Sequence, residues 1–298
     1  MRALVTGARG FVGHWLSAHL EDQGDDVITV DHEVDVTDAV AVTRAVGEAR
    51  PDAVYHLAAF THVGESWKNP DRVMEVNVLG TLHVLEAARA LPEPPVVLLT
   101  SSAEVYGAVA EDLLPVTELA PLAPVTPYAA SKVAAEYLGV QQHLACGLRV
   151  VRVRPFNHVG PGQATGFVVA SLASRIVEAR RSGAATVAVG NLSARRDFTD
   201  VRDVVRAYRL LVEKGTPGEV YNVCSGHAVV IEDIARRLLR LAGVSLELVP
   251  DPGLVRPVDV PVVCGDPAKL AAATGWAPEF DLDRTLGDIL EWSSSERP

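Results

Sequence analysis

The sequence predicts a doubly wound α/β fold, in which helices cover both faces of a parallel sheet, with a smaller second α/β lobe. First, short apolar runs alternate with helical patterns through the first half of the chain. Strands buried on both faces read as such continuous apolar runs. Second, a glycine-rich turn follows the first run. Third, the chain has 298 residues, 48% of them hydrophobic, which is enough to bury the cores of two lobes.

The expected strands and helices of the first half follow each other in strict alternation. Each strand is a short aliphatic run, and each helical segment has apolar residues at helical spacing. Strands that alternate with helices in this way form a parallel sheet. The expected strands are residues 2–6, 26–30, 52–59, 95–102 and 148–155. The expected helices are residues 11–21, 39–49 and 73–89, and one that begins at Tyr128 behind Pro127.

The second half of the chain has a looser pattern. Residues 157–166 are glycine-rich and turn-like, and a helix then runs to Arg181. A strand is expected within 218–226 and a helix within 231–243. The sequence from Pro250 onward is rich in Pro, Gly and Asp, which are turn-forming residues.

No linker or internal repeat separates two domains, so we expect the chain to cross between the lobes more than once. We place the first lobe at residues 1–156 and the second mainly at 157–298. Residues 196–224 are expected to return to the first lobe.

Composition and charge narrow the class of protein. The formal net charge of −11 argues against general binding to nucleic acid or to an anionic membrane, although a local basic pocket for a phosphorylated small molecule stays open. Three widely spaced cysteines indicate reduced thiols, with no disulfide framework and no metal. The N-terminus enters a strand at once, and no apolar run approaches the ~18–20 residues that span a bilayer. We therefore expect a cytoplasmic protein without a secretion signal.

A glycine turn follows the first strand. Gly7, Gly10 and Gly13 lie in the segment TGARGFVG, between the strand and the head of the first helix. Glycines at this point let a pyrophosphate approach backbone N–H groups at the positive end of the helix. The turn therefore predicts a dinucleotide site in the first lobe.

Charged residues near the second strand bear on which dinucleotide binds. Asp31 ends that strand, where an acidic residue commonly bonds the adenosine ribose hydroxyls. Its charge would also repel the 2′-phosphate of NADP. Asp35 lies where it either closes the adenine pocket or begins the next helix, and Arg9, inside the glycine turn, is within reach of a 2′-phosphate. Asp31 thus favours NAD(H), while Arg9 keeps NADP(H) open.

Polar residues are expected at the carboxyl edge of the sheet, where open α/β proteins bind ligands. Ser102 and Glu104 follow the fourth strand, and Tyr128 and Lys132 lie four apart at the start of a helix. Residues four apart share a helix face, and an ammonium beside a phenol lowers the pKa of the phenol. This pair therefore predicts a catalytic acid or base. Each motif alone also fits an ordinary turn or a pair of surface residues. Their order along one chain favours a catalytic role for them.

In this order, the glycine turn, Ser102, Tyr128 and Lys132 resemble the extended short-chain dehydrogenase/reductase family of nucleotide-sugar epimerases, dehydratases and reductases. Within that family, FNHVGPGQ, GNLSARRDFTDVRD and VYNVCSG look most like GDP-sugar enzymes, in particular GDP-4-keto-6-deoxy-D-mannose reductases, with GDP-mannose 4,6-dehydratases as close relatives. The resemblance covers essentially the whole chain. Its further motifs are HLAA (56–59), NVLGT (77–81), SSAEVYG (101–107), PYAASK (127–132), RPVDV (256–260), GDPAKL (265–270) and TGWAP (274–278).

The resemblance implies a Rossmann first lobe that binds NAD(P) and a smaller lobe that binds a nucleotide sugar. Tyr128 would donate a proton, and Lys132 would lower the pKa of Tyr128 and hold the nicotinamide ribose. Ser102 would bond the C4 oxygen of the sugar while the reduced nicotinamide supplies a hydride to C4. Glu104 stands where dehydratases keep a base for the proton on C5.

Further cofactor and substrate contacts follow from the same resemblance. Asn157 resembles a residue that contacts the sugar and diphosphate. Arg196 and Arg256 resemble diphosphate partners, a role that suits the rigid fork of donors on a guanidinium. The implied cofactor contacts are Gly7, Arg9, Gly10, Phe11, Val12, Gly13, Asp31, Asp35, Val36, Leu57, Ala58, Ala59, Tyr128 and Lys132.

Two histidines and two helices have more than one interpretation. His62 and His158 either line the substrate pocket or are packed or solvated histidines. The helices around 77–89 and 128–145 resemble a four-helix dimer interface, but their apolar pattern equally fits packing within one chain. We expect a homodimer from the resemblance.

Several activities stay open at this point. The first is reduction of the C4 ketone of GDP-4-keto-6-deoxy-D-mannose. The alternative is a GDP-mannose 4,6-dehydratase or a 4-epimerase, both of which recycle the cofactor internally, and a non-enzymatic dinucleotide sensor is a third. The nucleotide base, the sugar stereochemistry and the choice between NAD and NADP are not determined by these motifs.

Overall fold

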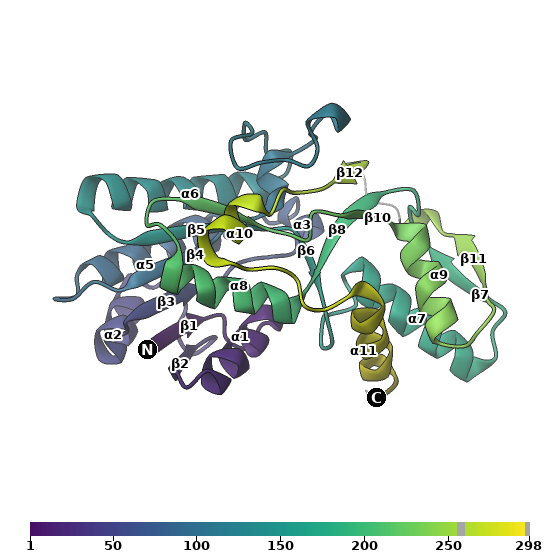
Figure 1. Cartoon of the computed structure of the whole chain (residues 1–298). Coiled ribbons are helices and arrows are strands. Elements are labelled where there is room, and N and C mark those ends of the chain that lie inside the picture. The colour runs from purple at the N-terminus through teal and green to yellow at the C-terminus, as the bar shows by residue number, and fades with distance from the viewer. Residues whose placement is uncertain (255–259, 296–298) are drawn as a thin grey trace.

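The computed structural model describes residues 1–254 and 260–295, and two lobes lie side by side in it (Figure 1). The central sheet of the first lobe has six parallel strands in the order β2-β1-β3-β4-β5-β9. The chain turns to opposite sides of β1 to make β2 and β3, which creates a switch point between β1 and β3. The strands are β1 (Arg2–Thr6), β2 (Asp26–Val30), β3 (Ala53–His56), β4 (Val96–Thr100), β5 (Val150–Pro155) and β9 (Val220–Val223).

Helices cover both faces of the central sheet. α1 (Phe11–Asp22) and α8 (Val201–Lys214) pack against each other on one face. On the other face, α2 (Ala39–Ala49), α5 (Gly80–Arg89) and α6 (Pro127–Cys146) follow one another in a row. The predicted doubly wound α/β fold is confirmed.

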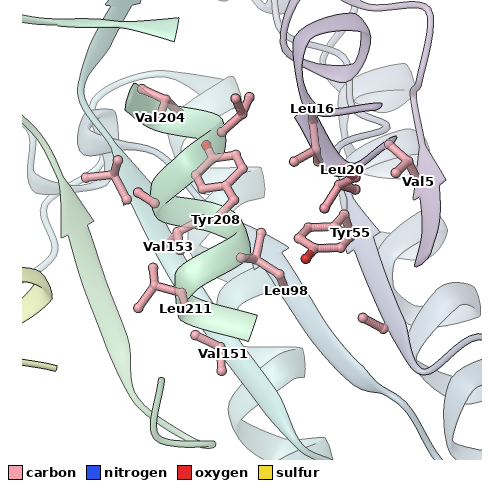
Figure 2. Packing of buried hydrophobic residues seen from close by; sticks show 14 of the residues in the cluster. Val5, Leu16, Leu20, Tyr55, Leu98, Val151, Val153, Val204, Tyr208 and Leu211 are labelled. Carbon is pink, nitrogen blue, oxygen red and sulfur yellow. The ribbon is translucent and has the colours of Figure 1, made fainter. Parts of the chain in front are cut away.

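An apolar layer joins the central sheet to the α1–α8 face, as Figure 2 shows. Burying one large aliphatic or aromatic side chain contributes about 1.5–3 kcal/mol to stability. Because α8 supplies part of this layer, a helix from the second half of the chain belongs to the core of the first lobe. The side chains labelled in Figure 2 are Val5, Leu16, Leu20, Tyr55, Leu98, Val151, Val153, Val204, Tyr208 and Leu211.

Local signals fix the start and the end of α6. Thr126 is the N-cap, and its hydroxyl accepts the N–H of Ala129 at 3.0 Å. Pro127 occupies the first helical position, where its fixed φ is already helical. Gly147 ends the helix in the left-handed region, with φ of 70°. Tyr128 therefore lies in the first turn of a helix whose beginning is rigidly held.

The helix expected over residues 73–89 is interrupted. It consists of α4 (Pro70–Met74), a π-helical turn (Glu75–Leu79) and α5. Asn77 lies in the π turn and is buried; its amide accepts the N–H of Phe60 at 2.7 Å and donates to the hydroxyl of Ser131 at 2.8 Å. A π turn adds one residue to a helical turn and is frequent at functional sites.

Within the described residues, the second lobe contains smaller sheets and three long helices. β8 pairs with β6, β10 and β12, while β7 pairs with β11. The strands are β6 (Asn157–Val159), β7 (Thr186–Val189), β8 (Arg195–Asp200), β10 (Ala228–Val230), β11 (Glu247–Pro250) and β12 (Val262–Val263). The helices are α7 (Val168–Ser182), α9 (Ile231–Leu241) and α11 (Leu282–Ser295).

The remaining elements are short. α10 (Ala268–Thr274) packs on α8, so the chain returns to the first lobe near its end. Within the described ranges, no helix is both long and apolar enough to cross a membrane. The other short helices are α3 (Val63–Ser66) and the 3₁₀ turns Ala103–Tyr106, Glu111–Leu113 and Pro252–Leu254.

Candidate active site

The glycine turn lies at the switch point of the central sheet. Gly7 has φ of 71°, and a Cβ at this position would lie 2.8 Å from the backbone nitrogen of Ala58. Only glycine combines this left-handed conformation with so close an approach. The turn that follows β1 is thereby held against the segment that follows β3.

The head of α1 fits an anionic ligand. A Cβ on Gly13 would overlap the carbonyl oxygen of Gly7 and lie 2.7 Å from the Cα of Ala8, so the helix packs directly on the turn. The N-cap residue is Gly10, which has no side chain to accept the N–H groups of the first turn; that turn begins with Phe11 and Val12. The first N–H groups of a helix need acceptors and carry the positive end of its dipole. These residues therefore fit the pyrophosphate of a dinucleotide.

Asp31 and Arg9 lie together at the edge of this turn. The Asp31 carboxylate accepts the backbone N–H of Arg9 at 2.7 Å and that of His32 at 2.9 Å. The Arg9 side chain is exposed and forms an ion pair with Glu33 at 3.6 Å. The acid that favours NAD and the guanidinium that favours NADP thus occupy the same edge.

The other implied adenine-side residues lie close to this edge. The Asp35 carboxylate accepts the N–H and the hydroxyl of Thr37 at 2.9 and 2.8 Å, and these bonds hold the pKa of Asp35 below its usual value. Val36 is buried, and a Cβ on Gly80 of α5 would lie 2.7 Å from its side chain. Leu57, Ala58 and Ala59 follow β3 and are half-buried.

Tyr128 and Ser102 are brought together by α6 and by the 3₁₀ turn that follows β4. Both residues are buried, and their side chains share a hydrogen bond. Burial raises the pKa of Tyr128 to about 12, the hydrogen bond with Ser102 opposes this rise, and the charge of Glu104 adds to it. At neutral pH Tyr128 is therefore a protonated donor.

The expectation that Lys132 lowers the pKa of Tyr128 is wrong. The two residues share a helix face as predicted, but the Lys132 ammonium lies 6.0 Å from the Tyr128 ring centroid and donates to the carbonyl oxygen of Thr100 at 2.9 Å. Loss of solvent around the phenol outweighs any attraction at that distance. Burial also lowers the pKa of Lys132 itself, to about 8.

A buried histidine near Lys132, His56, was not predicted from the sequence as a residue of the site. His56 bonds the hydroxyls of Thr6 and Thr81 at 2.8 and 3.1 Å. Burial, helped by the charge of Lys132, lowers the pKa of His56 to about 3. The ring is therefore neutral and joins β1 and α5 through hydrogen bonds. The HLAA motif contains this residue, but a single buried histidine has no sequence signal that separates it from ordinary core.

Asn77 and Ser131 support the backbone of Tyr128. The Ser131 hydroxyl accepts from Asn77 and donates to the carbonyl oxygen of Tyr128 at 2.7 Å. Because Asn77 also bonds the backbone of Phe60, this pair joins α6 to the segment that follows β3. Sequence reasoning missed both residues, although NVLGT and PYAASK contain them.

A cavity of about 400 Å³ lies in the second lobe, between the β6–β8 strands and α7. Asn157 and Arg196 both line it, as does His158, which stacks on Phe11 of α1 with ring centroids 6.1 Å apart. His62 instead caps α3, where its ring accepts the N–H of Glu65. The apolar walls include Val168, Leu172, Leu192, Phe198 and Ile231.

The predicted site residues thus fall into two groups. The four predicted catalytic residues are absent from the cavity lining described by the structure; they lie at the carboxyl edge of the central sheet. Arg196 donates to the carbonyl oxygens of Arg195 and Pro261, at 2.9 and 3.4 Å. Arg256, the other predicted diphosphate partner, lies outside the described residues.

Comparison with known proteins gives consistent matches over most of the chain. A model of the NAD dependent epimerase/dehydratase family matches residues 3–224. A GDP-6-deoxy-D-mannose reductase from Pseudomonas aeruginosa is 41% identical, over 99% of this chain and 98% of that protein. A GDP-mannose 4,6-dehydratase from Yersinia enterocolitica is 25% identical, over 97% and 92%. A solved structure of RMD from Pseudomonas aeruginosa complexed with NADPH superposes with a TM-score of 0.92 at 39% identity, covering 99% of both chains.

Proposed function

The chain belongs to the NAD dependent epimerase/dehydratase family, and from this premise we propose that it reduces the C4 ketone of GDP-4-keto-6-deoxy-D-mannose. Membership confirms the resemblance to nucleotide-sugar short-chain dehydrogenases and the predicted dependence on NAD(P). The observation that carries the proposed reaction is the 41% identity with a GDP-6-deoxy-D-mannose reductase along nearly the whole chain. The protonated Tyr128 beside Ser102 supplies the chemistry that such a reaction needs.

The chain's own residues perform the polar part of this reaction. A bound nicotinamide cofactor supplies the hydride. The Ser102 hydroxyl, close enough to bond Tyr128, donates a hydrogen bond to the C4 oxygen and stabilises the negative charge that develops on it. Tyr128 then gives its phenolic proton to that oxygen, because an alkoxide is a far stronger base than a phenolate.

Lys132 and the glycine turn hold the dinucleotide in this account. The Lys132 ammonium, which donates to the carbonyl oxygen of Thr100, is assigned to the nicotinamide ribose on the family resemblance. Gly7, Gly10 and Gly13 bring the pyrophosphate to the head of α1. Asp31 and Arg9 meet the adenosine ribose, and their shared edge accommodates either NAD(H) or NADP(H), with NAD(H) favoured by the acid.

The second-lobe cavity is assigned to the nucleotide part of the substrate. Asn157 and Arg196 line the end formed by β6 and β8, which supports contact with the sugar and the diphosphate. Apolar walls such as Val168 and Phe198 suit a base and its ribose. The GDP assignment rests on the names of the relatives and not on a base-reading contact.

A coupled assay tests the proposed reduction. Purified protein is mixed with GDP-4-keto-6-deoxy-D-mannose and with NADH or NADPH, and oxidation of the cofactor is followed by absorbance. We expect one cofactor consumed for each sugar reduced. Absence of oxidation with both cofactors would remove the reductase assignment.

A dehydratase is the second candidate because Glu104 lies near enough to Tyr128 to raise its pKa. That placement suits a base for the C5 proton, and the 25% identical relative is a GDP-mannose 4,6-dehydratase. A dehydratase would convert GDP-mannose to a keto-sugar with no added cofactor, and Glu104→Gln would abolish this conversion. The reductase proposal predicts that Glu104→Gln keeps most of the reduction.

We also propose the division into lobes, the assembly and the location. Residues 1–156 form the cofactor lobe together with α8 and β9 from the predicted return at 196–224 and with α10, since β9 pairs with β5 and α8 packs on both α1 and α10. The substrate lobe takes the other described residues after 156, including β8, which pairs with β6, β10 and β12. Exposed apolar residues on α6 and in the π turn, including Tyr137, Leu144 and Leu79, support a homodimer built on these helices. The reduced cysteines and the cofactor suit the cytoplasm.

A further inference from the structure

A buried polar network lies behind the Ser102–Tyr128 pair and has no part in the chemistry proposed above. It consists of Tyr106, Glu136, Arg154 and Asn222, each at most 4% exposed, and is called the Tyr106 network below. These residues come from four different segments: the 3₁₀ turn after β4, α6, β5 and β9.

Glu136 and Arg154 form the charged half of the network. The Arg154 Nε donates to Glu136 Oε2 at 3.1 Å, and its Nη2 donates to Oε1 at 2.6 Å. Arg152 adds a third bond to the same carboxylate at 3.1 Å. Two parallel bonds from one guanidinium fix both the distance and the orientation of the partners.

Tyr106 and Asn222 form the neutral half. The Arg154 Nη1 donates to the Tyr106 hydroxyl at 2.9 Å, and the guanidinium lies 4.9 Å from the Tyr106 ring centroid. The Tyr106 hydroxyl donates to Asn222 Oδ1 at 2.7 Å, and the Asn222 amide donates to the carbonyl oxygen of Val116 at 2.9 Å. The phenol therefore makes both bonds that a hydroxyl ordinarily makes.

The two ends of the network reach the two elements that carry the reactive groups. Tyr106 ends the 3₁₀ turn Ala103–Tyr106, whose N-cap is Ser102; the Ser102 hydroxyl accepts the N–H of Glu104 at 3.2 Å. Glu136 lies four residues after Lys132 on α6. The network thus joins the turn that carries Ser102 and Glu104 to the helix that carries Tyr128 and Lys132.

The Tyr106 network is expected to contribute more to the placement of the segments that it joins than to the stability of the fold. Replacing a buried ion pair by apolar side chains of similar size is often neutral or stabilising. A fully satisfied buried polar network, in contrast, selects one arrangement of the segments that it joins. We propose that Tyr106, held by Arg154 and Glu136, is a positioning residue that sets the placement of Ser102 and Glu104 relative to Tyr128.

The variant Tyr106→Phe tests this proposal, because it removes one hydroxyl and keeps the ring in the core. Tyr55→Phe is the matched control: Tyr55 is a fully buried tyrosine of β3 whose hydroxyl has no hydrogen-bond partner in the described part of the chain. Two measurements are made on the full-length protein. Amide hydrogen exchange of residues 102–107 is followed by mass spectrometry, and kcat and KM are measured for reduction of the keto-sugar.

We expect Tyr106→Phe to speed exchange in residues 102–107 and Tyr55→Phe to leave it unchanged. We expect kcat of Tyr106→Phe to fall about tenfold to a hundredfold, the loss that follows when reacting groups shift by about 1 Å. The KM for the cofactor should stay within about twofold, since the glycine turn is untouched.

Three results would overturn the proposal: unchanged exchange in 102–107, an unchanged kcat, or the same loss of kcat in Tyr55→Phe. The activity measurement rests on the proposed function, whereas the exchange measurement does not. If the parent protein fails to turn over the keto-sugar, the reductase assignment falls, and the exchange comparison still decides the role of Tyr106.

Discussion

Tyr128 carries the reactive proton in this account, and its environment determines how. Burial keeps the phenol protonated, with a pKa of about 12, and the phenol lies within hydrogen-bond reach of Ser102. A proton donor of this kind needs no deprotonation before the reaction. We therefore propose that the charge of Lys132 serves cofactor binding and not acidification of the phenol.

Removing the phenolic hydroxyl tests that assignment. We expect Tyr128→Phe to lower kcat by about 10²–10⁴-fold, the usual contribution of one positioned acid. The Kd for NADH or NADPH should change far less than kcat, because the glycine turn, Asp31 and Lys132, which are further implied cofactor contacts, are all kept. Steady-state kinetics and fluorescence titration measure the two quantities. A parent-like kcat in Tyr128→Phe would rule out this proton donor.

Lys132 predicts a pH dependence of cofactor binding. Its lowered pKa of about 8 means that the ammonium is charged below that pH and neutral above it. The attraction for the dinucleotide is thus present at lower pH and lost as pH rises through about 8. We expect the Kd for NADH and NADPH to increase above this point, and Lys132→Met to bind weakly with no such inflection. An inflection that persists in Lys132→Met would assign it to another group.

At the residue scale, the sequence predicted that Tyr128 and Lys132 lie on one helix face, but it did not predict their pKa values. The spacing of Tyr128 and Lys132 correctly places both on one face of α6, because that spacing depends only on local helix geometry. The pKa values depend on burial by distant segments, so the predicted direction for Tyr128 was wrong. Sequence reasoning missed Tyr106 for the same reason, because its hydrogen-bond partners Arg154 and Asn222 come from distant parts of the chain.

At the scale of elements, the glycine turn and the head of α1 act as one unit. We expect Gly13→Ala to weaken NADPH binding at least about tenfold, because the added methyl group would push α1 away from the turn. Forcing a methyl group into a packed site also costs about 1–3 kcal/mol of stability. Fluorescence titration and thermal unfolding measure these effects.

Gly47→Ala supplies the control for this prediction. Gly47 lies within α2, and a Cβ there would meet no atom within 4 Å. Alanine should therefore stabilise the helix by about 0.5–1 kcal/mol and leave cofactor binding unchanged. Parent-like NADPH affinity in Gly13→Ala would contradict the assignment of the glycine turn.

The elements of the first lobe were predicted more accurately than those of the second. β1, β2 and α2 have the predicted bounds, because each is a compact run with clear flanking turns. The π turn within 73–89 was not predicted, because one extra residue in a single helical turn hardly changes the spacing of apolar residues along the helix. α10 and α11 were also missed, because the Pro- and Gly-rich composition after Pro250 obscures the helical pattern of both segments.

At the scale of the whole molecule, we propose that a second copy of the chain covers the exposed apolar residues of α6 and the π turn. Leu144 is 78% exposed, Tyr137 60% and Leu79 48%, although α5 and α6 already pack on one another and on the sheet. We expect the parent protein to be dimeric in light scattering and Tyr137→Glu to be monomeric. Val249→Glu, an exposed apolar position on β11 in the other lobe, should remain dimeric. A dimeric Tyr137→Glu would place the interface elsewhere.

The two-lobe arrangement separates the reacting edge of the central sheet from the cavity that we assign to the nucleotide. Reduction at C4 requires that one bound substrate reach from that cavity to Tyr128. The most direct test follows the hydride itself: the keto-sugar is incubated with NADH or NADPH that bears deuterium at the transferable position, and the product is analysed by NMR and mass spectrometry. We expect one deuterium at C4 for each cofactor oxidised, with the same product formed about 10²–10⁴-fold more slowly by Tyr128→Phe. A product without deuterium, or formation of a keto-sugar from GDP-mannose without added cofactor, would contradict the proposed reduction.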